Sequence, residues 1–233
     1  MNKFVSFVLI LAAALTAVMA QDQVPPPKPP LVRMPPAGSE WSLEIRNPTA
    51  PRGESPESSS GRVVPVRFEM RIGRNGVQQG TTRFSDGHTQ TFYVVEDQIL
   101  QQHDNAGDVA VLAPRDGAPL DLFDFRVRSF PALGWISLRN YVGVETLGKQ
   151  PCHKYQLQNV AEFELPEKDV LIAWIRAGDG FPQRVQIGEV VYEFSEVRPF
   201  SGEVSLPALF QAAVEKRRAE QRRLNALKAA NKY

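Results

Sequence analysis

Apolar and polar residues alternate one by one along short segments of this chain, and turn-forming residues separate the segments. The clearest segment has an apolar residue at every second position: Val64, Val66, Phe68, Met70 and Ile72. Side chains of a β-strand point to opposite faces in turn, so this alternation predicts a strand with one buried face and one solvated face. Asn75-Gly76 follows it and favours a two-residue hairpin turn.

The same pattern recurs along the chain and predicts an antiparallel meander. Turn residues are found at Ser85-Asp86-Gly87, Glu96-Asp97 and 104–107. Further strands are expected at 40–46, 81–84, 141–147, 154–158, 170–176, 183–187 and 190–197. Neighbouring strands are rotated by roughly 20 to 25°, so a long antiparallel sheet curls. The predicted fold is therefore mainly β, a curved antiparallel sheet or half-barrel of about ten to eleven strands with a C-terminal helix.

Residues 1–20 are typical of a secretory signal peptide. Lys3 precedes an apolar run from Val5 to Val18, and small residues lead to an expected cleavage after Ala20. The run is shorter than the roughly 20 residues of a spanning helix, so a retained membrane anchor is the weaker alternative. We expect a periplasmic or secreted protein that is soluble after signal cleavage.

Composition divides the rest of the chain into three parts. Residues 21–38 are rich in proline, which donates no backbone hydrogen bond, and predict an extended tether, either a spacer or a ligand for a proline-reading module. Residues 39–200 contain the expected half-barrel domain, with a polar loop at 47–62 and a short helix or irregular cover at 114–134. Residues 206–233 favour a basic helix.

Cys152 and the three histidines form no recognisable catalytic or metal site. His88, His103 and His153 are expected on different strands, without the paired spacing of metal ligands. Cys152 is the only cysteine, and we interpret it as a small packed residue, with a reactive thiol or an intermolecular bridge as the alternative. Adjacent strand residues point to opposite faces, so Cys152 and His153 are not expected to share a proton.

No motif indicates an enzyme. Asp121 and Asp124 lie one helical turn apart, but solvated carboxylates on an amphipathic turn are a simpler interpretation than an acid-base pair. The sequence contains no G-x-S-x-G, no glycine-rich phosphate loop and no H-E-x-x-H. We therefore predict a protein without catalysis, cofactor or bound metal.

The C-terminal end is basic. Seven Lys or Arg residues and two Glu residues lie between Glu215 and Tyr233. The side chains of Arg217, Arg218, Arg222 and Arg223 predict contact with an anionic surface, such as lipid headgroups or a wall polymer. The alternative is a solvated helix whose basic residues interact favourably with its C-terminal dipole. The formal net charge of the chain is +1, so its overall charge does not indicate a nucleic-acid partner.

The C-terminal strands resemble those of a known superfamily. The segment from Val170 to Val197 has a strand containing Trp174, a Gly-Asp-Gly-Phe-Pro turn at 178–182, and two strands ending in Tyr192 and Phe194. With the preceding strand at 147–158, it resembles the outer-membrane lipoprotein carriers, the LolA-like and LolB-like proteins. The resemblance implies a half-barrel of about eleven antiparallel strands whose apolar interior is closed by helices over lipid acyl chains.

The resemblance also implies which side chains line the interior. They are Trp41, Val66, Phe68, Met70, Ile72, Phe92, Trp174, Tyr192 and Phe194. Alternation alone does not distinguish a lined cavity from a solid core, so both remain open. The carriers begin with a helix that plugs the half-barrel, whereas this chain has a proline-rich segment there. The helix from Leu206 would have to take that place, or the cavity stays open.

These observations leave two hypotheses of function. The first is an exported, non-enzymatic, carrier-like protein that binds a lipid, lipoprotein acyl chains or another apolar ligand in the half-barrel. The second is an envelope interaction or scaffold protein with a filled β domain, in which the proline tether or the basic helix engages a protein or polyanionic partner. An enzyme is a distant third, and would need polar side chains that converge in one cleft.

Overall fold

The fold is taken from a computed structural model. It describes residues 24–47, 63–95, 98–102, 109–112, 130–158 and 169–230. Several sequence predictions fall outside these residues: the signal peptide, nearly all of the polar loop, the turns at 96–97 and 104–107, His103, residues 114–129 of the expected cover, and the pair Asp121 and Asp124.

Twelve strands of the described chain form one antiparallel sheet. Their bounds are β1 Ser39–Arg46, β2 Pro65–Ile72, β3 Gln78–Phe84, β4 Thr89–Val95, β5 Gln98–Gln102, β6 Val109–Leu112, β7 Tyr141–Leu147, β8 Gln150–Leu157, β9 Leu171–Arg176, β10 Pro182–Ile187, β11 Val190–Phe194 and β12 Arg198–Pro199. Their spatial order is β6-β5-β4-β3-β2-β1-β11-β10-β9-β8-β7, and the short β12 pairs with β1. A 3-10 helix, Leu138–Asn140, precedes β7, and helix α2 spans Ala208–Ala230.

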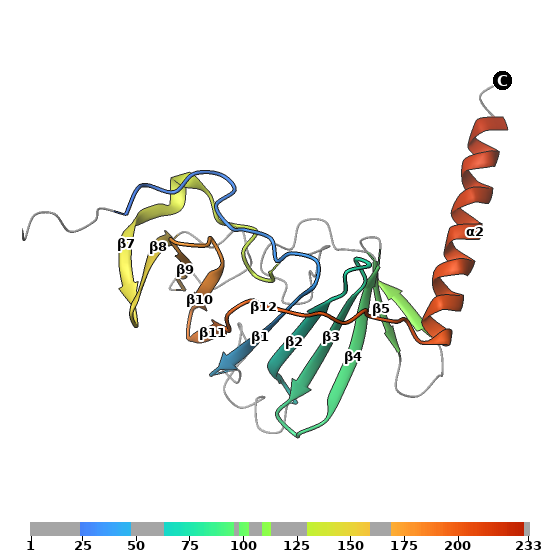
Figure 1. Cartoon of the computed structure of the whole chain (residues 1–233), viewed down its shortest axis with the longest axis horizontal. Helices are drawn as coiled ribbons and strands as arrows, with labels where there is room; N and C mark the ends of the chain where they lie inside the picture. The colour runs from blue at the N-terminus through green and yellow to red at the C-terminus, as the bar shows by residue number, and fades with distance from the viewer. Residues whose placement is uncertain are drawn as a thin grey trace, which may run out of the picture.

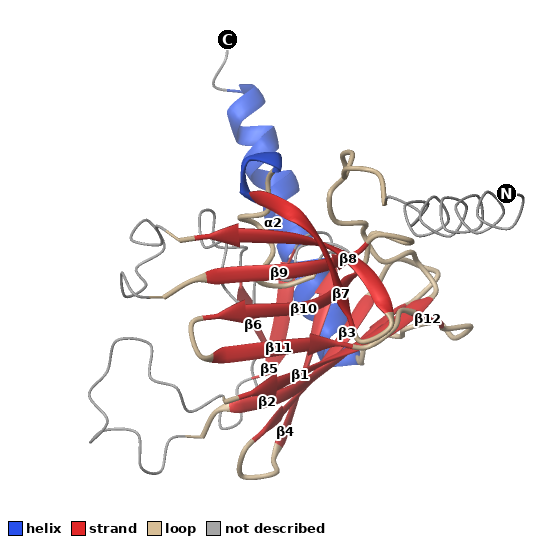
Figure 2. Cartoon of the chain, turned by 90° about the vertical axis from the view of Figure 1, so that its left-hand side faces the viewer, coloured by secondary structure: helices blue, strands red, loops and turns tan. Residues whose placement is uncertain are grey.

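Strand β1 joins two meanders, one running from β1 to β6 and the other from β7 to β11 (Figure 2). Leu43 of β1 lies opposite Phe68 of β2 and Phe194 of β11. The sheet curves but does not close, because its end strands, β6 and β7, do not pair with each other in the described part of the chain (Figure 1). The predicted fold class, a curved antiparallel sheet with a C-terminal helix, is confirmed.

The predicted turns at Asn75-Gly76 and Ser85-Asp86-Gly87 connect β2 to β3 and β3 to β4, whereas those at 96–97 and 104–107 lie outside the described residues. Gly76 adopts a positive φ of 81° between β2 and β3, a conformation that glycine takes without steric cost. The Asn75 side chain accepts a hydrogen bond from the Val77 backbone and donates one to the Val204 carbonyl oxygen. The turn therefore also anchors the segment that leads to α2.

Most buried apolar side chains lie on the concave face of the curved sheet, which we term the inner face. One contiguous cluster, termed the inner-face cluster, contains Trp41, Leu43, Ile45, Phe68, Met70, Ile72, Phe92, Val94, Ile99, Phe130, Ala132, Leu133, Trp135, Tyr155, Leu171, Ala173, Ile175, Val185, Ile187, Val190, Tyr192 and Phe194. It draws on strands from both meanders. The two meanders therefore share a single core.

Helix α2 packs on the opposite, outer face of the sheet. Phe210 and Val214 are buried against Tyr93 and Leu100, and the rings of Tyr93 and Phe210 lie 4.8 Å apart. Figure 1 shows the rest of α2 projecting away from the sheet. Tyr93 of β4 and Leu100 of β5 are opposite each other on the outer face, and α2 docks on them. The helix therefore does not plug the half-barrel. Within the described residues, no helix has the length and apolarity to span a membrane.

Candidate functional site

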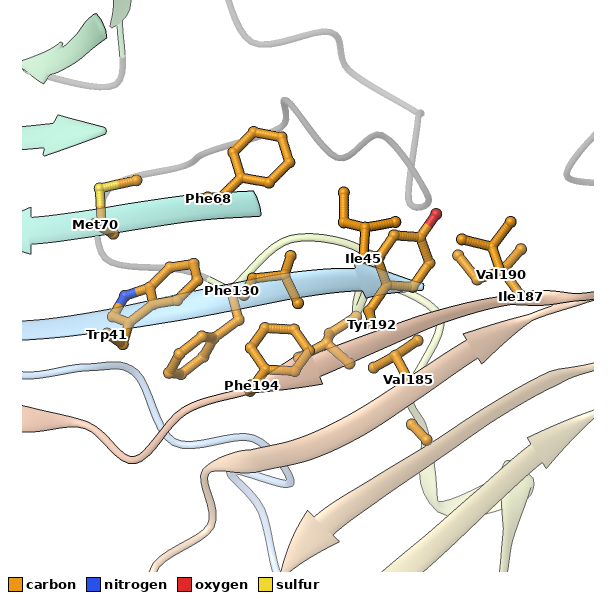
Figure 3. Close-up of a cluster of buried hydrophobic side chains, with 14 of the residues drawn as sticks. Trp41, Ile45, Phe68, Met70, Phe130, Val185, Ile187, Val190, Tyr192 and Phe194 are labelled. Atoms are coloured by element: carbon orange, nitrogen blue, oxygen red, sulfur yellow. The ribbon is translucent and has the colours of Figure 1, made fainter. Parts of the chain in front are cut away.

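Three aromatic rings pack together at the centre of the inner face (Figure 3). Phe130 lies 4.9 Å from the ring of Trp41 and 5.7 Å from that of Phe194, measured between centroids. Phe181, in the turn before β10, lies 6.0 Å from Phe130. Tilted and edge-to-face contacts at these distances stabilise aromatic pairs beyond the area that they bury. Phe130 thereby links the sheet to the segment that covers it.

That covering segment, residues 130–136, is irregular. Four of its side chains belong to the inner-face cluster: Phe130, Ala132, Leu133 and Trp135. Its hydrogen bonds, within the described residues, are local: Trp135 Nε1 donates to the Ala132 carbonyl oxygen, and the Asn140 side chain donates to that of Trp135. The cover is therefore held on the sheet chiefly by apolar side-chain contacts. The sequence predicts a short helix or irregular cover at 114–134, and its described residues, 130–134, are irregular. Residues 114–129 lie outside the described part of the chain.

The end of the proline-rich segment also contacts the core. Leu31 and Val32 are partly buried against the inner-face cluster, and the Arg33 backbone donates a 2.8 Å hydrogen bond to the Gly180 carbonyl oxygen. The Gly38 backbone donates to the carbonyl oxygen of Ile72. This part of the predicted tether therefore packs along the domain.

Seven of the predicted lining residues lie together in the inner-face cluster: Trp41, Phe68, Met70, Ile72, Phe92, Tyr192 and Phe194. Val66 is only partly buried, beside a register shift between β2 and β3. Whether the seven residues line a cavity for a ligand or fill a solid core stays a matter of proposal. These seven residues share one face of the sheet, as the alternation of apolar residues predicts.

Trp174 does not lie on the inner face, so its inclusion among the lining residues is wrong. Its neighbours Ala173 and Ile175 belong to the inner-face cluster, and the strand pleat turns Trp174 to the outer face. There its ring lies between two cations, with Lys154 Nζ 5.5 Å and the Arg184 guanidinium 5.9 Å from the centroid. Trp174 therefore makes cation–π contacts on the outer face and does not line the inner face.

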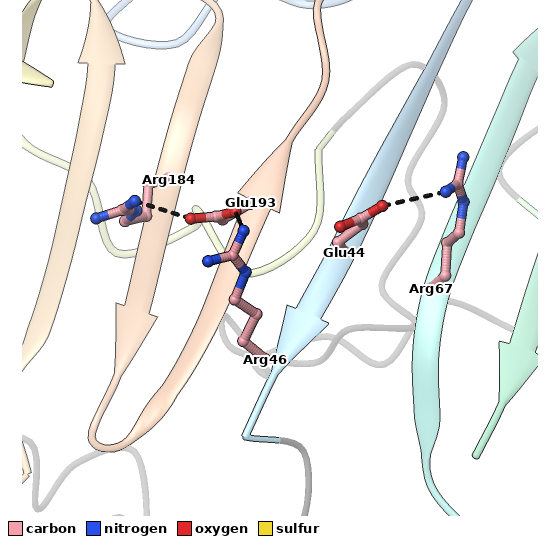
Figure 4. Close-up of polar contacts among 5 residues, drawn as sticks. All are labelled: Glu44, Arg46, Arg67, Arg184 and Glu193. Atoms are coloured by element: carbon pink, nitrogen blue, oxygen red, sulfur yellow. Dashed lines mark hydrogen bonds and ion pairs between the residues drawn. The ribbon is translucent and has the colours of Figure 1, made fainter. Parts of the chain in front are cut away.

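Charged side chains cover the outer face of β2, β1, β11 and β10 (Figure 4). Arg184 of β10 contacts Glu193 of β11 at 2.8 Å, and Arg67 of β2 contacts Glu44 of β1 at 3.1 Å. Exposed ion pairs of this kind each contribute little to stability. Their consequence is a solvated outer face, which leaves the apolar inner face as the candidate binding surface.

The outer face also has a hollow of about 320 Å³ beside β12. Its lining includes Glu40, Glu69, Arg67, Arg71 and Arg198. Carboxylates and guanidinium groups are mixed there, and Arg71 pairs with Glu40 at 3.5 Å. The hollow therefore has no net preference for a cation or an anion, and it is not suited to an apolar ligand.

Cys152 and His153 lie on opposite faces of β8, because Cys152 is opposite Arg176 and His153 is opposite Ile175 of β9. Burial raises the pKa of the Cys152 thiol, which keeps it protonated and unreactive near neutral pH. His88 contacts Asp86 at 2.6 Å on an exposed turn. Within the described residues, no three metal-ligating side chains come together.

Sequence reasoning missed the polar end of the inner face. His153 and Tyr155 face inward from β8, and the Tyr141 ring lies 5.8 Å from His153 and 5.7 Å from Tyr155. The alternation of His153, Tyr155 and Leu157 was available as a signal. Burial raises the pKa of Tyr155 to about 12 and lowers that of His153, so both side chains are neutral near pH 7.

His153 makes the stability of the fold depend on pH. Its ordinary pKa is 6.5 and burial lowers this value in the folded state, so the unfolded chain binds the proton first as the pH falls. The free energy of unfolding should therefore decrease as the pH drops below about 6.5, until the pH passes the folded-state pKa. Melting temperatures measured at about pH 7.5 and about pH 5.5 should differ less in the His153→Leu variant than in the wild type. An equal difference in both proteins would contradict this assignment.

Comparisons with known proteins find similar solved structures, but no similar sequence. No model of a known protein family matches the sequence, and a search of curated proteins finds no match. Similar solved structures include the lipoprotein LppX of Mycobacterium tuberculosis, with 13% identity and a TM-score of 0.39 over 73% of this chain and 90% of that one. A LolA superfamily protein from Nitrosomonas europaea has 9% identity and a TM-score of 0.29 over 76% of this chain and 90% of that one.

The Pseudomonas aeruginosa MucA/MucB complex is a third similar structure, with 15% identity and a TM-score of 0.36 over 74% of this chain and 54% of that one. The superfamily that the sequence resembles is therefore among the matches. At these identities and TM-scores the likeness concerns a loosely shared fold, and nothing about ligands follows from it.

Proposed function

We propose that this chain is an exported, carrier-like protein without enzymatic activity, which binds a lipid acyl chain or another apolar ligand between the inner face and its cover. The ligand would contact the aromatic residues at the centre of that face, Trp41, Phe130 and Phe194. The helix α2 stays outside the site, because it packs on the other face of the sheet.

The observation that supports this proposal is how the apolar inner face is covered. Residues 130–136 contact the sheet through side chains such as Phe130 and Leu133, and the hydrogen bonds that they make with other described residues are local. Moving the cover therefore exposes apolar surface without breaking strand pairing. An elongated apolar molecule is the ligand that this surface would accept.

The energetics favour such an exchange. Burial of apolar surface contributes about 25 cal/mol per Å², whichever molecule supplies the partner surface. An acyl chain that takes the place of Phe130 and Leu133 would recover much of the free energy lost when they leave. The local hydrogen bonds of the cover move with it, so they are not lost.

The direct test is a fluorescence titration of the mature protein with an apolar, environment-sensitive dye, followed by competition with fatty acids and phospholipid. Saturable binding that these lipids compete away is the expected result. Native mass spectrometry of protein from its own host should in addition show retained lipid. If the protein takes up no dye and retains no lipid, the inner face is a filled core.

A second function, binding to an anionic surface, is favoured by a separate observation. Residues 215–230 of α2 are all exposed, and they include Arg217, Arg222 and Arg223. Basic residues near an anionic membrane contribute about 1 kcal/mol each. Among the described residues, the buried side chains by which α2 packs on the sheet are Phe210 and Val214, both in its first turns.

This second function is tested by removing residues 215–233. The shortened protein keeps the docking side chains, so its melting temperature should match the wild type, while its cosedimentation with anionic vesicles should be lost. A matched pair of full-length variants refines the result: glutamine in place of Arg217, Arg218, Arg222 and Arg223 should abolish cosedimentation, and lysine at the same positions should retain it. Unchanged cosedimentation after truncation would exclude the helix as the binding element.

A further inference from the structure

Among the residues that the structure describes, two buried polar groups of β8 find no hydrogen-bond partner at one end of the inner face. Tyr155 is fully buried and its hydroxyl makes no hydrogen bond; His153 is 9% exposed and its Nδ1 makes none. A buried polar group without a partner destabilises the fold, because it has given up its hydrogen bonds to water. Native proteins rarely leave such groups unpaired, so two of them on the same face of one strand indicate a ligand that pairs with them.

The surroundings of these groups are apolar on the inner face. Tyr155 belongs to the inner-face cluster, and its partner across the strands is Ala173. His153 lies opposite Ile175, and Tyr141 packs against both rings. The two polar atoms therefore stand at the edge of the apolar surface on which we have placed the ligand.

The site provides hydrogen bonds but no charge. Both side chains are neutral near pH 7, because burial shifts the pKa of each away from its charged form. The nearest cations on β8 and β9 belong to the outer face and are already paired: Lys154 with Glu145 at 2.7 Å, and Arg176 with Asp179 at 3.0 Å. An ionised carboxylate or phosphate buried here would find no free counter-charge on β8 or β9, and burial of an unpaired charge is strongly unfavourable.

We propose that His153 and Tyr155 form a subsite for a neutral oxygen-containing group, an ester or a hydroxyl, at the head of an apolar chain. The Tyr155 hydroxyl donates a hydrogen bond to the ligand oxygen. The neutral imidazole of His153 offers Nδ1 as a donor or an acceptor, according to its tautomer, so an ester and an alcohol are both accommodated. This inference rests on the proposed function, and it names the ligand class that the inner face selects.

Trp41 Nε1 also finds no hydrogen-bond partner among the described residues, but it does not form a second subsite. Within the same residues, the ring contacts of Trp41 are with Phe130 and Phe194. A single donor among aromatic rings does not distinguish one polar group from another. The pair on β8 is different, because the Tyr155 hydroxyl donates a hydrogen bond and His153 Nδ1 either donates or accepts one.

The test compares four ligands of equal chain length: an alkane, an alcohol, a methyl ester and an ionised fatty acid. Their affinities are measured by displacement of a bound apolar dye from the full mature protein. In the wild type, the ester and the alcohol should bind more tightly than the alkane, and the ionised acid should bind less tightly than the ester. In Tyr155→Phe, the ratio of ester to alkane affinity should fall about three- to tenfold, the loss of one net hydrogen bond.

Two controls separate this result from a loss of fold. Tyr155→Phe removes an unpaired buried hydroxyl, so its melting temperature should equal or exceed that of the wild type. Tyr93→Phe makes the same chemical change on the outer face, next to α2, and should leave the affinity ratio unchanged. A fall of several degrees in the melting temperature of Tyr155→Phe would show that the hydroxyl has a partner in the free protein, and would overturn the proposal.

The outcomes also distinguish this proposal from the proposed function. If all four ligands bind and Tyr155→Phe keeps the wild-type affinity ratio, the subsite is wrong and the carrier function stands. If no apolar ligand displaces the dye, or the dye does not bind, the carrier function fails and the subsite fails with it. His153→Leu provides an independent check, because it should lower the same ratio.

Discussion

Replacing Phe130 by alanine is expected to destabilise the fold and to increase its affinity for an apolar dye. The ring is buried between Trp41, Phe181 and Phe194, and loss of such a side chain costs about 3 to 4 kcal/mol. The space that it leaves lies between the cover and the inner face, where we have placed the ligand. Urea unfolding gives the loss of stability, and dye titration gives the affinity.

Phe210→Ala is the matched control for this experiment. Phe210 is also buried, at 5% exposure, but it packs on the outer face with Tyr93. Its removal should lower stability while leaving the affinity for the dye as in the wild type. Equal increases in dye affinity in both variants would mean that the dye reports general loosening of the protein, and would remove the support for the inner face as the site.

Gly80→Ala should destabilise the protein by about 2 to 3 kcal/mol, although it adds a single methyl group. Gly80 of β3 lies opposite Phe92 of β4, and the Phe92 ring lies across the glycine. A Cβ atom at residue 80 would overlap three carbons of that ring, so Phe92 would have to leave its buried position. The change should be visible as a lower midpoint in urea unfolding.

A second-site change and a control identify the cause of this effect. Leucine in place of Phe92 removes the overlapping ring, so the double variant should regain part of the stability that Gly80→Ala loses. Gly178→Ala places a Cβ in open space and should change stability by less than about 0.5 kcal/mol. An equally small effect of Gly80→Ala would mean that the Phe92 ring does not lie across this glycine.

The strands and the buried face of the sheet could be predicted because they follow from a local rule. In β1 and β2 the side chains alternate between core and solvent, and Trp41, Phe68 and Met70 lie where that period places them. The error at Trp174 came from giving an aromatic side chain more weight than its position. Ala173 and Ile175, its smaller neighbours, show the correct inner face of β9.

The position of α2 and the polar pair on β8 depend on contacts between distant segments, so the sequence alone did not reveal them. Phe210 docks on Tyr93 of β4, and the register between β4 and β5 places Leu100 beside Tyr93. The alternation of His153 and Tyr155 was visible, but the lack of a hydrogen-bond partner for each is a property of the packed core. A sequence pattern gives the face of a residue, and only the assembled sheet gives its neighbours.

The central position of β1 determines the order in which this sheet can be completed during synthesis. Ser42 and Ser195, which are hydrogen-bonded, are 153 residues apart in the sequence. A chain that emerges N-terminus first can form the meander from β1 to β6 early, but one edge of β1 then stays unpaired until β11 follows. Contacts of such long sequence separation slow folding, and an unpaired strand edge is where chains aggregate. The half-synthesised protein is therefore the stage at which this fold most needs protection by a chaperone.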